Sequence, residues 1–354
     1  MPDVFGRTYT PAALNQLVGD MSQLAGVRLC ELVDGDARGV RVADVYTGGG
    51  LSFSVLLDRG MDIGEARFAG RSLTIHTAVG WAHPARYEPE GAGWLRTWGG
   101  GLMTGCGLGW MGRPTVDEGE PLGLHGRMSH HSAANVCTGA GWQGDDYVIW
   151  VEGEVTEAAL FGTKLRLSRR ISTKLGAAWL HIEDHVQNIG FEPAPHMMLY
   201  HCNFGFPVVS PDSEVLIDTL NVQPRDAQAA SGVGDYARFQ QPTPGYAEQV
   251  FYHTVRADAD DYARAAIVNR ALDFGAYVRY RQAELPWLVH WKMMGARDYV
   301  CGLEPGNAGV TGRDEARAAG HLRILEPQET VAYSVEIGAL PTRAAIATYE
   351  GQER

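Results

Sequence analysis

The chain has 354 residues, of which 45% are apolar and 20% are charged, the composition of an ordinary globular protein. Its 30 basic residues are outnumbered by 42 acidic ones, so the formal net charge is −12. A nucleic-acid-binding protein is expected to present a basic surface, and this balance argues against that class. The 44 glycines and 17 prolines indicate many turns.

Cellular location is constrained by what the sequence lacks. No apolar run approaches the length of about 18 residues that a membrane-spanning helix needs. The segment from Met1 to Arg7 has no basic stretch followed by an apolar one, so no secretory signal is expected. The five cysteines are odd in number and widely spaced, which argues against a disulfide framework. We therefore expect a cytoplasmic protein with no nucleic-acid or membrane partner.

One helix is predicted near the N-terminus, over residues 10–24. Thr10 is a suitable N-cap residue, and Pro11 suits the first helical position. Apolar residues then recur at steps of three and four, which is typical of one face of a helix. They are Leu14, Leu17, Val18, Met21 and Leu24.

After this helix the period of the apolar residues changes to two, which predicts strands. The predicted strands cover residues 40–45, 51–57, 147–155, 164–173, 180–186, 197–206, 215–222, 276–281, 322–325 and 330–337. Short strands between turn residues favour an all-β sandwich or barrel. Helices do not alternate with the strands, which argues against a doubly wound α/β fold. Residues 226–243 indicate a long loop, and a short helix is expected at residues 341–349.

The segment His181-Ile-Glu-Asp-His185 is similar to a zinc motif, but that motif needs a helix. Here the surrounding residues alternate as in a strand, which would place Leu180, Ile182, Asp184 and Val186 on one face. The two histidines and Glu183 would then lie on the other face. We interpret this second face as solvated, without a metal.

Four segments carry the strongest functional signal when they are taken together. They are Gly123-Leu-His-Gly-Arg127, Leu199-Tyr-His-Cys-Asn-Phe-Gly205, Pro244-Gly-Tyr-Ala-Glu-Gln-Val-Phe251 and Gly302-Leu-Glu-Pro305. In this order they resemble the aldose 1-epimerase (galactose mutarotase) family, in a diverged bacterial branch without a settled substrate. The resemblance spans roughly residues 40–340.

The resemblance implies a fold and a domain organisation. It implies an all-β, galactose mutarotase-like supersandwich of mostly antiparallel strands with a short N-terminal helix. Residues 1–354 would form a single domain, in which residues 1–39 are a helical lead-in. Fold transfers between relatives more safely than reaction does.

The resemblance also implies site residues. Glu304 corresponds to the general base and His201 to the acid, while His125, Arg127, Arg96 and Glu248 would bind the substrate. Two departures stand out. Cys-Asn-Phe follows His201 where the family usually has Tyr-Phe in its motif, and Glu248 replaces the usual Asp.

These residue types suit the opening of a cyclic sugar. A base takes the proton of the C1 hydroxyl while an acid protonates the ring oxygen, and the open aldehyde recloses on its other face. A carboxylate and an imidazole on opposite sides of the ring would suffice. A flat apolar face for the sugar could come from tryptophans, namely Trp81, Trp94, Trp98 and Trp110. The leading hypothesis is thus an isomerase that acts on a small-molecule sugar without a cofactor.

The sequence leaves three other functions open. An aldose–ketose isomerase or an epimerase at another carbon could share the fold, with a divalent metal held by His201, Glu248 and His253. A sugar-binding module would need no catalysis. A glycoside hydrolase would need two carboxyl groups across the bond, such as Glu248 and Glu304.

These residues leave phosphorylated, acidic and neutral sugars open as substrates. A homodimer that covers exposed sheet edges is consistent with a long sandwich.

Overall fold

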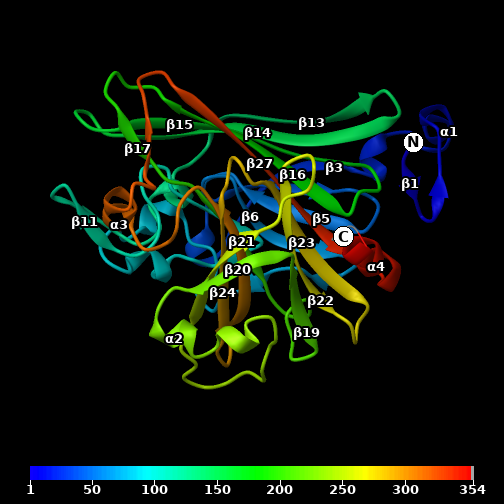
Figure 1. The fold of residues 1–354 in the computed structure, drawn as a ribbon. Helices are drawn as coiled ribbons and strands as arrows, with labels where there is room; N and C mark the ends of the chain where they lie inside the picture. The colour runs from blue at the N-terminus through cyan, green and yellow to red at the C-terminus, as the bar shows by residue number, and fades with distance from the viewer. Residues whose placement is uncertain (352–354) are drawn as a thin grey trace.

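Within residues 1–351, which the computed structural model describes, the strands form two large antiparallel sheets (Figure 1). The larger sheet has 11 strands, in the order β20 (Thr219–Pro224), β21 (Gln249–Val255), β24 (Trp287–Met294), β25 (Tyr299–Gly306), β18 (Leu199–Phe204), β10 (Met103–Cys106), β6 (Asp62–Phe68), β5 (Leu51–Leu56), β4 (Arg41–Tyr46) and β3 (Gly26–Glu31), with β7 (Arg71–Ser72) beside β6. The smaller sheet has eight strands, in the order β13 (Ala134–Gln143), β14 (Asp146–Ala158), β15 (Lys164–Lys174), β16 (Trp179–Asn188), β27 (Thr330–Leu340), β23 (Phe274–Arg281), β22 (Tyr262–Asn269) and β19 (Ser213–Ile217). This architecture confirms the predicted mostly antiparallel β-sandwich.

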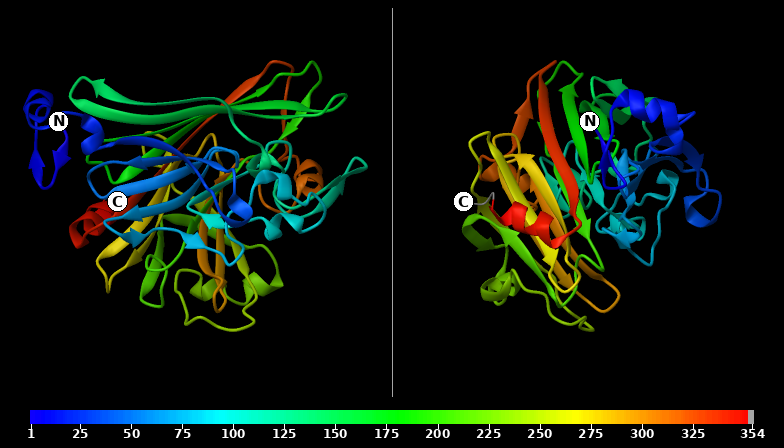
Figure 2. Two further views of the ribbon diagram at one scale, coloured as in Figure 1. Left: turned by 180° about the vertical axis from the view of Figure 1, so that it is seen from behind. Right: turned by 90° about the vertical axis from the view of Figure 1, so that its right-hand side faces the viewer.

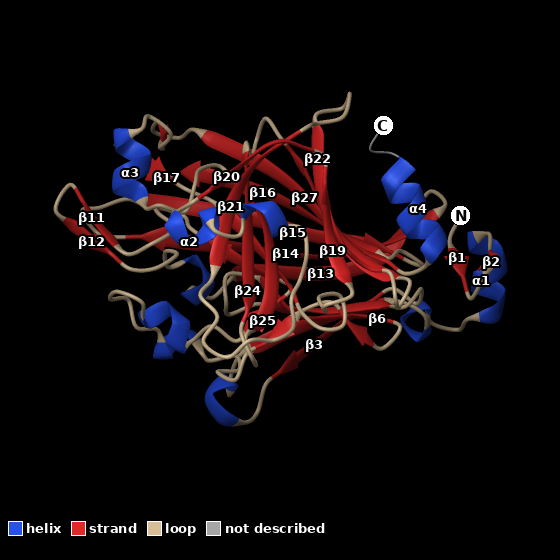
Figure 3. Ribbon diagram, turned by 60° about the horizontal axis from the view of Figure 1, so that its bottom comes forward, coloured by secondary structure: helices blue, strands red, loops and turns tan. Residues whose placement is uncertain are grey.

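Short elements decorate the two sheets. Two-stranded pairs are formed by β1 (Asp3–Val4) with β2 (Arg7–Thr8), β8 (Ile75–His76) with β9 (Gly100–Gly101), β11 (Thr115–Asp117) with β12 (Glu120–Leu122), and β17 (Ala194–His196) with β26 (Arg323–Leu325). The helices are α1 (Pro11–Leu17), α2 (Ala227–Ala230), α3 (Arg313–Ala318) and α4 (Arg343–Gly351). Figure 3 shows α1, α3 and α4 at the outer edges of the molecule. The N-terminal segment and α4 lie at the same end of the molecule (Figure 2).

The predicted N-terminal helix is shorter than expected. Thr10 does cap it, because its hydroxyl accepts a hydrogen bond from the Ala13 amide at 3.1 Å. However, α1 ends at Leu17, just before Gly19, and a separate 3-10 turn follows at Met21–Gln23, capped by Asp20. The lead-in is also not only helical, since β3 joins the large sheet as an edge strand.

Strand prediction worked where one face is wet and failed where polar and apolar residues do not alternate. In β16, Leu180, Ile182, Asp184 and Val186 are buried as predicted, between more exposed neighbours. The central strand β25 is almost continuously buried, and the more exposed face of β24 carries Trp287, Trp291 and Met293. Neither sequence alternates between polar and apolar residues, so both strands were missed. In the two large sheets, strands β3, β6, β7, β10, β13, β21 and β22 were missed as well.

The predicted single strand at residues 215–222 is two strands. β19 ends at Ile217 and belongs to the small sheet, whereas β20 begins at Thr219 and forms the edge of the large sheet. The chain changes sheets at Asp218. Beyond β20, the expected loop 226–243 contains α2 and a 3-10 turn at Val233–Asp235.

The strand β18 shows how the large sheet separates two apolar clusters. Tyr200 and Cys202 point into the main core between the sheets. Leu199 packs instead in a second cluster on the outer face of the large sheet, together with Trp94 and Trp98. His201 lies between Tyr200 and Cys202 in sequence and therefore shares the outer face with Leu199.

A buried ion pair joins two strands inside the sandwich. Arg169 of β15 and Asp184 of β16 approach to 2.6 Å, and both side chains are 0% exposed. Tyr200 donates its hydroxyl hydrogen to Asp184 at 2.6 Å, and Arg169 also donates to the carbonyl oxygens of Gly60 and Met61. The polar groups of this pair are thus satisfied, which a buried charge requires.

Candidate active site

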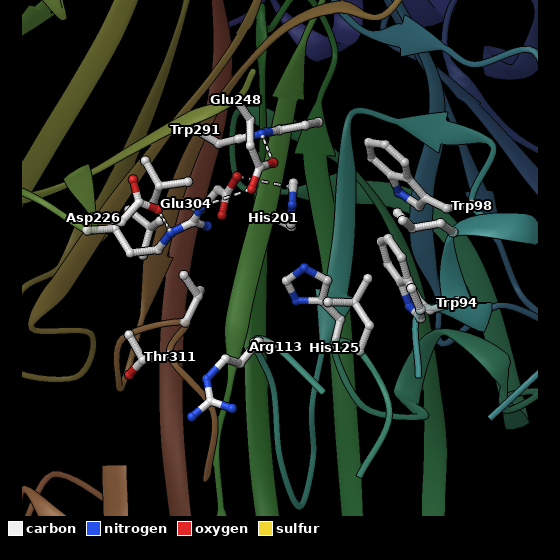
Figure 4. A pocket seen from close by; sticks show the side chains of 18 of the residues that line it. Trp94, Trp98, Arg113, His125, His201, Asp226, Glu248, Trp291, Glu304 and Thr311 are labelled. Carbon is white, nitrogen blue, oxygen red and sulfur yellow. Dashed lines mark hydrogen bonds and ion pairs between the residues drawn. The ribbon is translucent and has the colours of Figure 1, made fainter. Parts of the chain in front are cut away.

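A cleft of about 620 Å³ lies on the outer face of the large sheet (Figure 4). Strands β24, β25 and β18 supply its floor through Val289, Trp291, Glu304 and His201. Loops and short elements form the walls. Figure 4 shows Trp94 and Trp98 on one side, and Asp226 and Thr311 on the other.

His201 and Glu304 meet because their strands are neighbours in register. The antiparallel partners Leu199 with Gly306, and Asn203 with Gly302, bracket the two residues, so they lie opposite each other. Nδ1 of His201 is 3.3 Å from Oε1 of Glu304, and the side chains are only 8% and 2% exposed. The two groups therefore lie side by side on the floor, not on opposite sides of a bound ring as the sequence suggested.

The environment of Glu304 favours the neutral carboxyl group. Burial raises its pKa well above the usual value, and the negative charge of Glu248 raises it further, while Arg225 acts in the opposite direction. Within residues 1–351, Oε1 has no hydrogen-bond partner.

The environment of His201 favours the neutral ring. Burial lowers its pKa to about 4, although the hydrogen bond to Asn203 opposes the shift. At neutral pH the free protein thus holds a neutral imidazole beside a carboxyl group with a raised pKa.

Tryptophans give the cleft an apolar wall. Trp94 and Trp98 stack with ring centroids 5.4 Å apart, and Trp98 lies 5.9 Å from Trp291 and 5.7 Å from His201. Trp98 is fixed by a 3.0 Å hydrogen bond from its indole nitrogen to Thr104, which pairs with His201 across β10 and β18. Aromatic walls with a few convergent polar groups are typical of small-molecule sites.

The rim of the cleft carries two arginines, and both are ion-paired. Arg225 contacts Asp226 at 2.9 Å and Glu248 at 3.0 Å. Glu248 also accepts a 2.8 Å hydrogen bond from the indole nitrogen of Trp291. Arg113 pairs with the acidic residues Asp314 and Glu315 at the start of α3.

His125 enters the cleft from a strained turn. Its φ of 58° lies in the left-handed region, which is uncommon for a residue other than glycine and is a recurrent feature of functional sites. The turn is held by its own amide, which donates to the Gly112 carbonyl at 2.9 Å. Its ring lies 5.4 Å from the ring of His201. Burial and this neighbouring histidine lower the pKa of His125 well below its usual value.

The structure brings four of the sequence-predicted site residues to one cleft. They are His125, His201, Glu248 and Glu304. Arg96 instead pairs with Glu88 on the surface at 2.7 Å, and the guanidinium of Arg127 stacks 4.9 Å from the Trp110 ring; neither arginine is among the residues that line the cleft. The roles assigned to these residues remain predictions.

The metal ligands of the alternative hypothesis are not assembled. His253 lies on the opposite face of β21 from Val250, which lines the cleft, and its ring packs against Tyr236 and His290. Across residues 1–351, no group of three or more His, Cys, Asp or Glu side chains is placed to hold a metal ion. The proposed set of His201, Glu248 and His253 is therefore wrong as a shared site.

Several lining residues escaped sequence reasoning. Trp291 lies on a strand that was missed, and Arg225 directly follows β20, whose start was misplaced. Asp226 begins the long loop that the sequence did single out. Of the four tryptophans expected to contact the sugar, Trp94 and Trp98 line the cleft, whereas Trp81 and Trp110 are not among its lining residues.

Comparison with known proteins places the chain in a family. Residues 37–339 match the model of a family described as Domain of unknown function (DUF4432). The chain belongs to the DUF4432 family. No curated protein matches this DUF4432 protein. Among residues 1–351, no helix combines the length and the apolar character needed to span a membrane.

Solved structures resemble this DUF4432 protein over most of its length. A candidate aldose 1-epimerase from Klebsiella pneumoniae is 25% identical, with a TM-score of 0.88 over 92% of this chain and 86% of that one. A galactose mutarotase-like protein from Clostridium acetobutylicum is 13% identical, with a TM-score of 0.64 over 90% and 99% of the two chains. Galactose 1-epimerase from Lactobacillus acidophilus is 12% identical, with a TM-score of 0.57 over 88% and 98%. These similarities confirm the predicted fold and the resemblance to the mutarotase family.

Proposed function

We propose that this DUF4432 protein is a sugar isomerase that opens and recloses the ring of a free aldose or a sugar derivative. The observation that carries the proposal is the 3.3 Å approach of His201 and Glu304 on the floor of an aromatic cleft. The similarity to a candidate aldose 1-epimerase supports the same reaction class.

The side-by-side arrangement suits the chemistry. The C1 hydroxyl oxygen and the ring oxygen of a cyclic sugar are bonded to the same carbon, so the group that takes one proton and the group that gives the other must lie close together. Two adjacent titratable groups meet this need. The sugar would lie across the floor of the cleft, against Trp98 and Trp291, with its hydroxyls towards Glu248 and His125.

The proposal is tested by exchange spectroscopy between the α and β anomers of a panel of aldoses. Glu304→Gln and His201→Asn keep polar side chains of similar shape but cannot transfer the proton. Each should slow anomer exchange by about 10²–10⁴-fold, the usual contribution of a positioned acid or base. The double variant should lose less than the product of the two factors, because the groups act in one step. Glu183→Gln, on the exposed face of β16, is the matched control and should have no effect.

Three outcomes would contradict the proposal. Unchanged exchange in Glu304→Gln, with an active wild type, would make Glu304 a structural carboxyl group. Uptake of deuterium from D₂O into a C–H bond would indicate isomerisation at another carbon, because ring opening exchanges only O–H protons. Saturable binding of a sugar without exchange of its anomers would indicate a binding module.

A further inference from the structure

Asn203 makes hydrogen bonds that determine which nitrogen of His201 carries the hydrogen. The Asn203 side-chain nitrogen donates to the carbonyl oxygens of His201 at 2.7 Å and of Gly101 at 3.2 Å. Its Oδ1 lies 2.6 Å from Nδ1 of His201. Carbonyl oxygens only accept, so the amide orientation of Asn203 is fixed and Oδ1 must face the ring as an acceptor. Nδ1 of His201 is therefore the protonated nitrogen.

The remaining nitrogen of His201 is free for the substrate. A neutral imidazole that carries its hydrogen on Nδ1 has a lone pair on Nε2. No hydrogen bond joins Nε2 to another side chain or backbone group of residues 1–351, and His201 lines the cleft. The ring thus presents a proton acceptor to the cleft.

Few groups around Glu304 would stabilise a negative charge on its carboxyl group. Its side chain is buried, and Oε1 has no hydrogen-bond donor within the described part of the chain. Arg225, the arginine of the rim whose charge acts on Glu304, is already paired with Asp226 and Glu248. Burial without a free cation favours the protonated carboxyl group, in agreement with the raised pKa.

We propose that Asn203 is a positioning residue that holds His201 as the Nδ1–H tautomer, so that Nε2 accepts the C1 hydroxyl proton while the carboxyl group of Glu304 protonates the ring oxygen. This inference rests on the proposed function. It reverses the roles that the family resemblance suggests, and it gives a task to Asn203, which lies at one of the positions where the sequence departs from that family.

The proton transfers balance over the cycle. The O1–H proton passes to Nε2 of His201, C1=O1 forms, and the C1–O5 bond breaks with its electron pair going to O5, which takes the proton of Glu304. After rotation about C1–C2, O5 attacks C1 and returns its proton to Glu304. The C1 oxygen then regains a proton from His201, and the starting enzyme is restored.

The test measures the tautomer directly, on the sugar-free protein labelled with ¹⁵N at histidine. Two-bond ¹H–¹⁵N correlation spectra distinguish protonated from unprotonated ring nitrogens, and His201→Asn identifies the signals by their loss. At neutral pH the wild type should show a protonated Nδ1 and an unprotonated Nε2. Asn203→Ala should mix the tautomers, and its anomer exchange should fall by roughly 10²-fold or more, since the wrong histidine tautomer costs serine proteases about 10⁴ in kcat.

Two further variants separate positioning from folding. Asn203→Asp keeps the acceptor, but its negative charge should raise the pKa of His201, so both ring nitrogens should be protonated at neutral pH. Asn221→Ala, on the exposed edge strand β20, should change neither the spectrum nor the exchange rate.

Several results would overturn the inference. In the wild type these are an Nε2–H tautomer or a doubly protonated ring at neutral pH, and neither observation depends on how a variant of Asn203 folds. Retention of the pure Nδ1–H tautomer in Asn203→Ala would remove the positioning role. A wild type with the expected tautomer that exchanges no aldose would refute the proton transfers together with the proposed function, whereas the spectra would still establish that Asn203 sets the ring.

Discussion

The carboxyl group of Glu304 occupies the space that a side chain at Gly302 would fill. The two residues share one face of β25, and a Cβ atom on Gly302 would lie 2.1 Å from Oε1 of Glu304 and 3.2 Å from Cβ of Trp291. The approach to Oε1 is possible only if the carboxyl group moves, and the contact with Trp291 is tight. Glycine at this position therefore permits the conformation that brings Glu304 to His201.

Gly302→Ala should displace the Glu304 carboxyl group and slow anomer exchange by about 10²-fold or more, since misplacement by about 1 Å can cost this much. The displaced side chain can turn away, so the variant should still fold. Gly141→Ala in β13 is the control, because its Cβ would meet no atom within 4 Å. Equal activity of the two variants would show that the observed position of Glu304 is not needed.

Glu248 should set the alkaline limit of activity. Burial is the main cause of the raised pKa of Glu304, and the negative charge of Glu248 is the second. In Glu248→Gln that contribution is lost, so the pKa of Glu304 falls and its proton dissociates at lower pH. We expect the alkaline limb of the pH–rate profile to move to lower pH, while the acid limb, set by His201, stays in place. An unchanged alkaline limb would contradict the coupling between the two carboxyl groups.

The buried side chain of His290 should lower the free energy of unfolding in mild acid. It is fully buried, and neither ring nitrogen has a hydrogen-bond partner within residues 1–351. Burial lowers its pKa well below the usual value, and nearby His253 and Lys292 lower it further. The unfolded chain therefore binds a proton below about pH 6.5 that the folded chain excludes, and stability is lost as the pH falls.

His290→Phe should raise the free energy of unfolding by about 1 kcal/mol near neutral pH, since an unsatisfied buried polar group costs about 1–3 kcal/mol. The gain should grow at about pH 5, because one source of acid destabilisation is removed. Urea denaturation at both pH values measures it, with the exposed His321→Phe as the control. A gain independent of pH would refute the titration argument.

Breaking the interior ion pair should be far more costly than breaking one at the surface. Asp184→Asn leaves the Arg169 charge buried without its partner and should lower the free energy of unfolding by about 3–5 kcal/mol. The surface pair of Arg256 and Asp218 is 3.1 Å long but largely exposed, and Asp218→Asn should cost less than about 1 kcal/mol. Similar losses in both variants, measured by urea denaturation, would contradict the role of burial.

The sequence predicted the architecture because many strands, such as β16, have one buried face and one more exposed face. That His201 and Glu304 share a site was predicted from the resemblance of their motifs to a known family. The periodicity of apolar residues gave no such indication. The sequence could not predict their register, because β25 is buried on both faces and its sequence shows no alternation. Trp291 was hidden because the more exposed face of β24 carries apolar side chains, so polar and apolar residues do not alternate in that strand.

Arg96 shows the opposite error. An arginine beside a Trp-rich segment suits a sugar site, yet its side chain extends to the surface and pairs with Glu88, eight residues earlier. Sequence order does not say which side of a short 3-10 segment faces the cleft. Here Trp94 turns inward and Arg96 outward.

The tryptophans that line the cleft allow ligand binding to be followed by intrinsic fluorescence. Trp94, Trp98 and Trp291 line the cleft, and the latter two lie within 5.7 Å of the imidazole of His201. Indole emission responds to the removal of water and to a neighbouring imidazole. A compound that enters the cleft should therefore change the intrinsic fluorescence whether or not it reacts, so candidate sugars can be ranked by titration without any label.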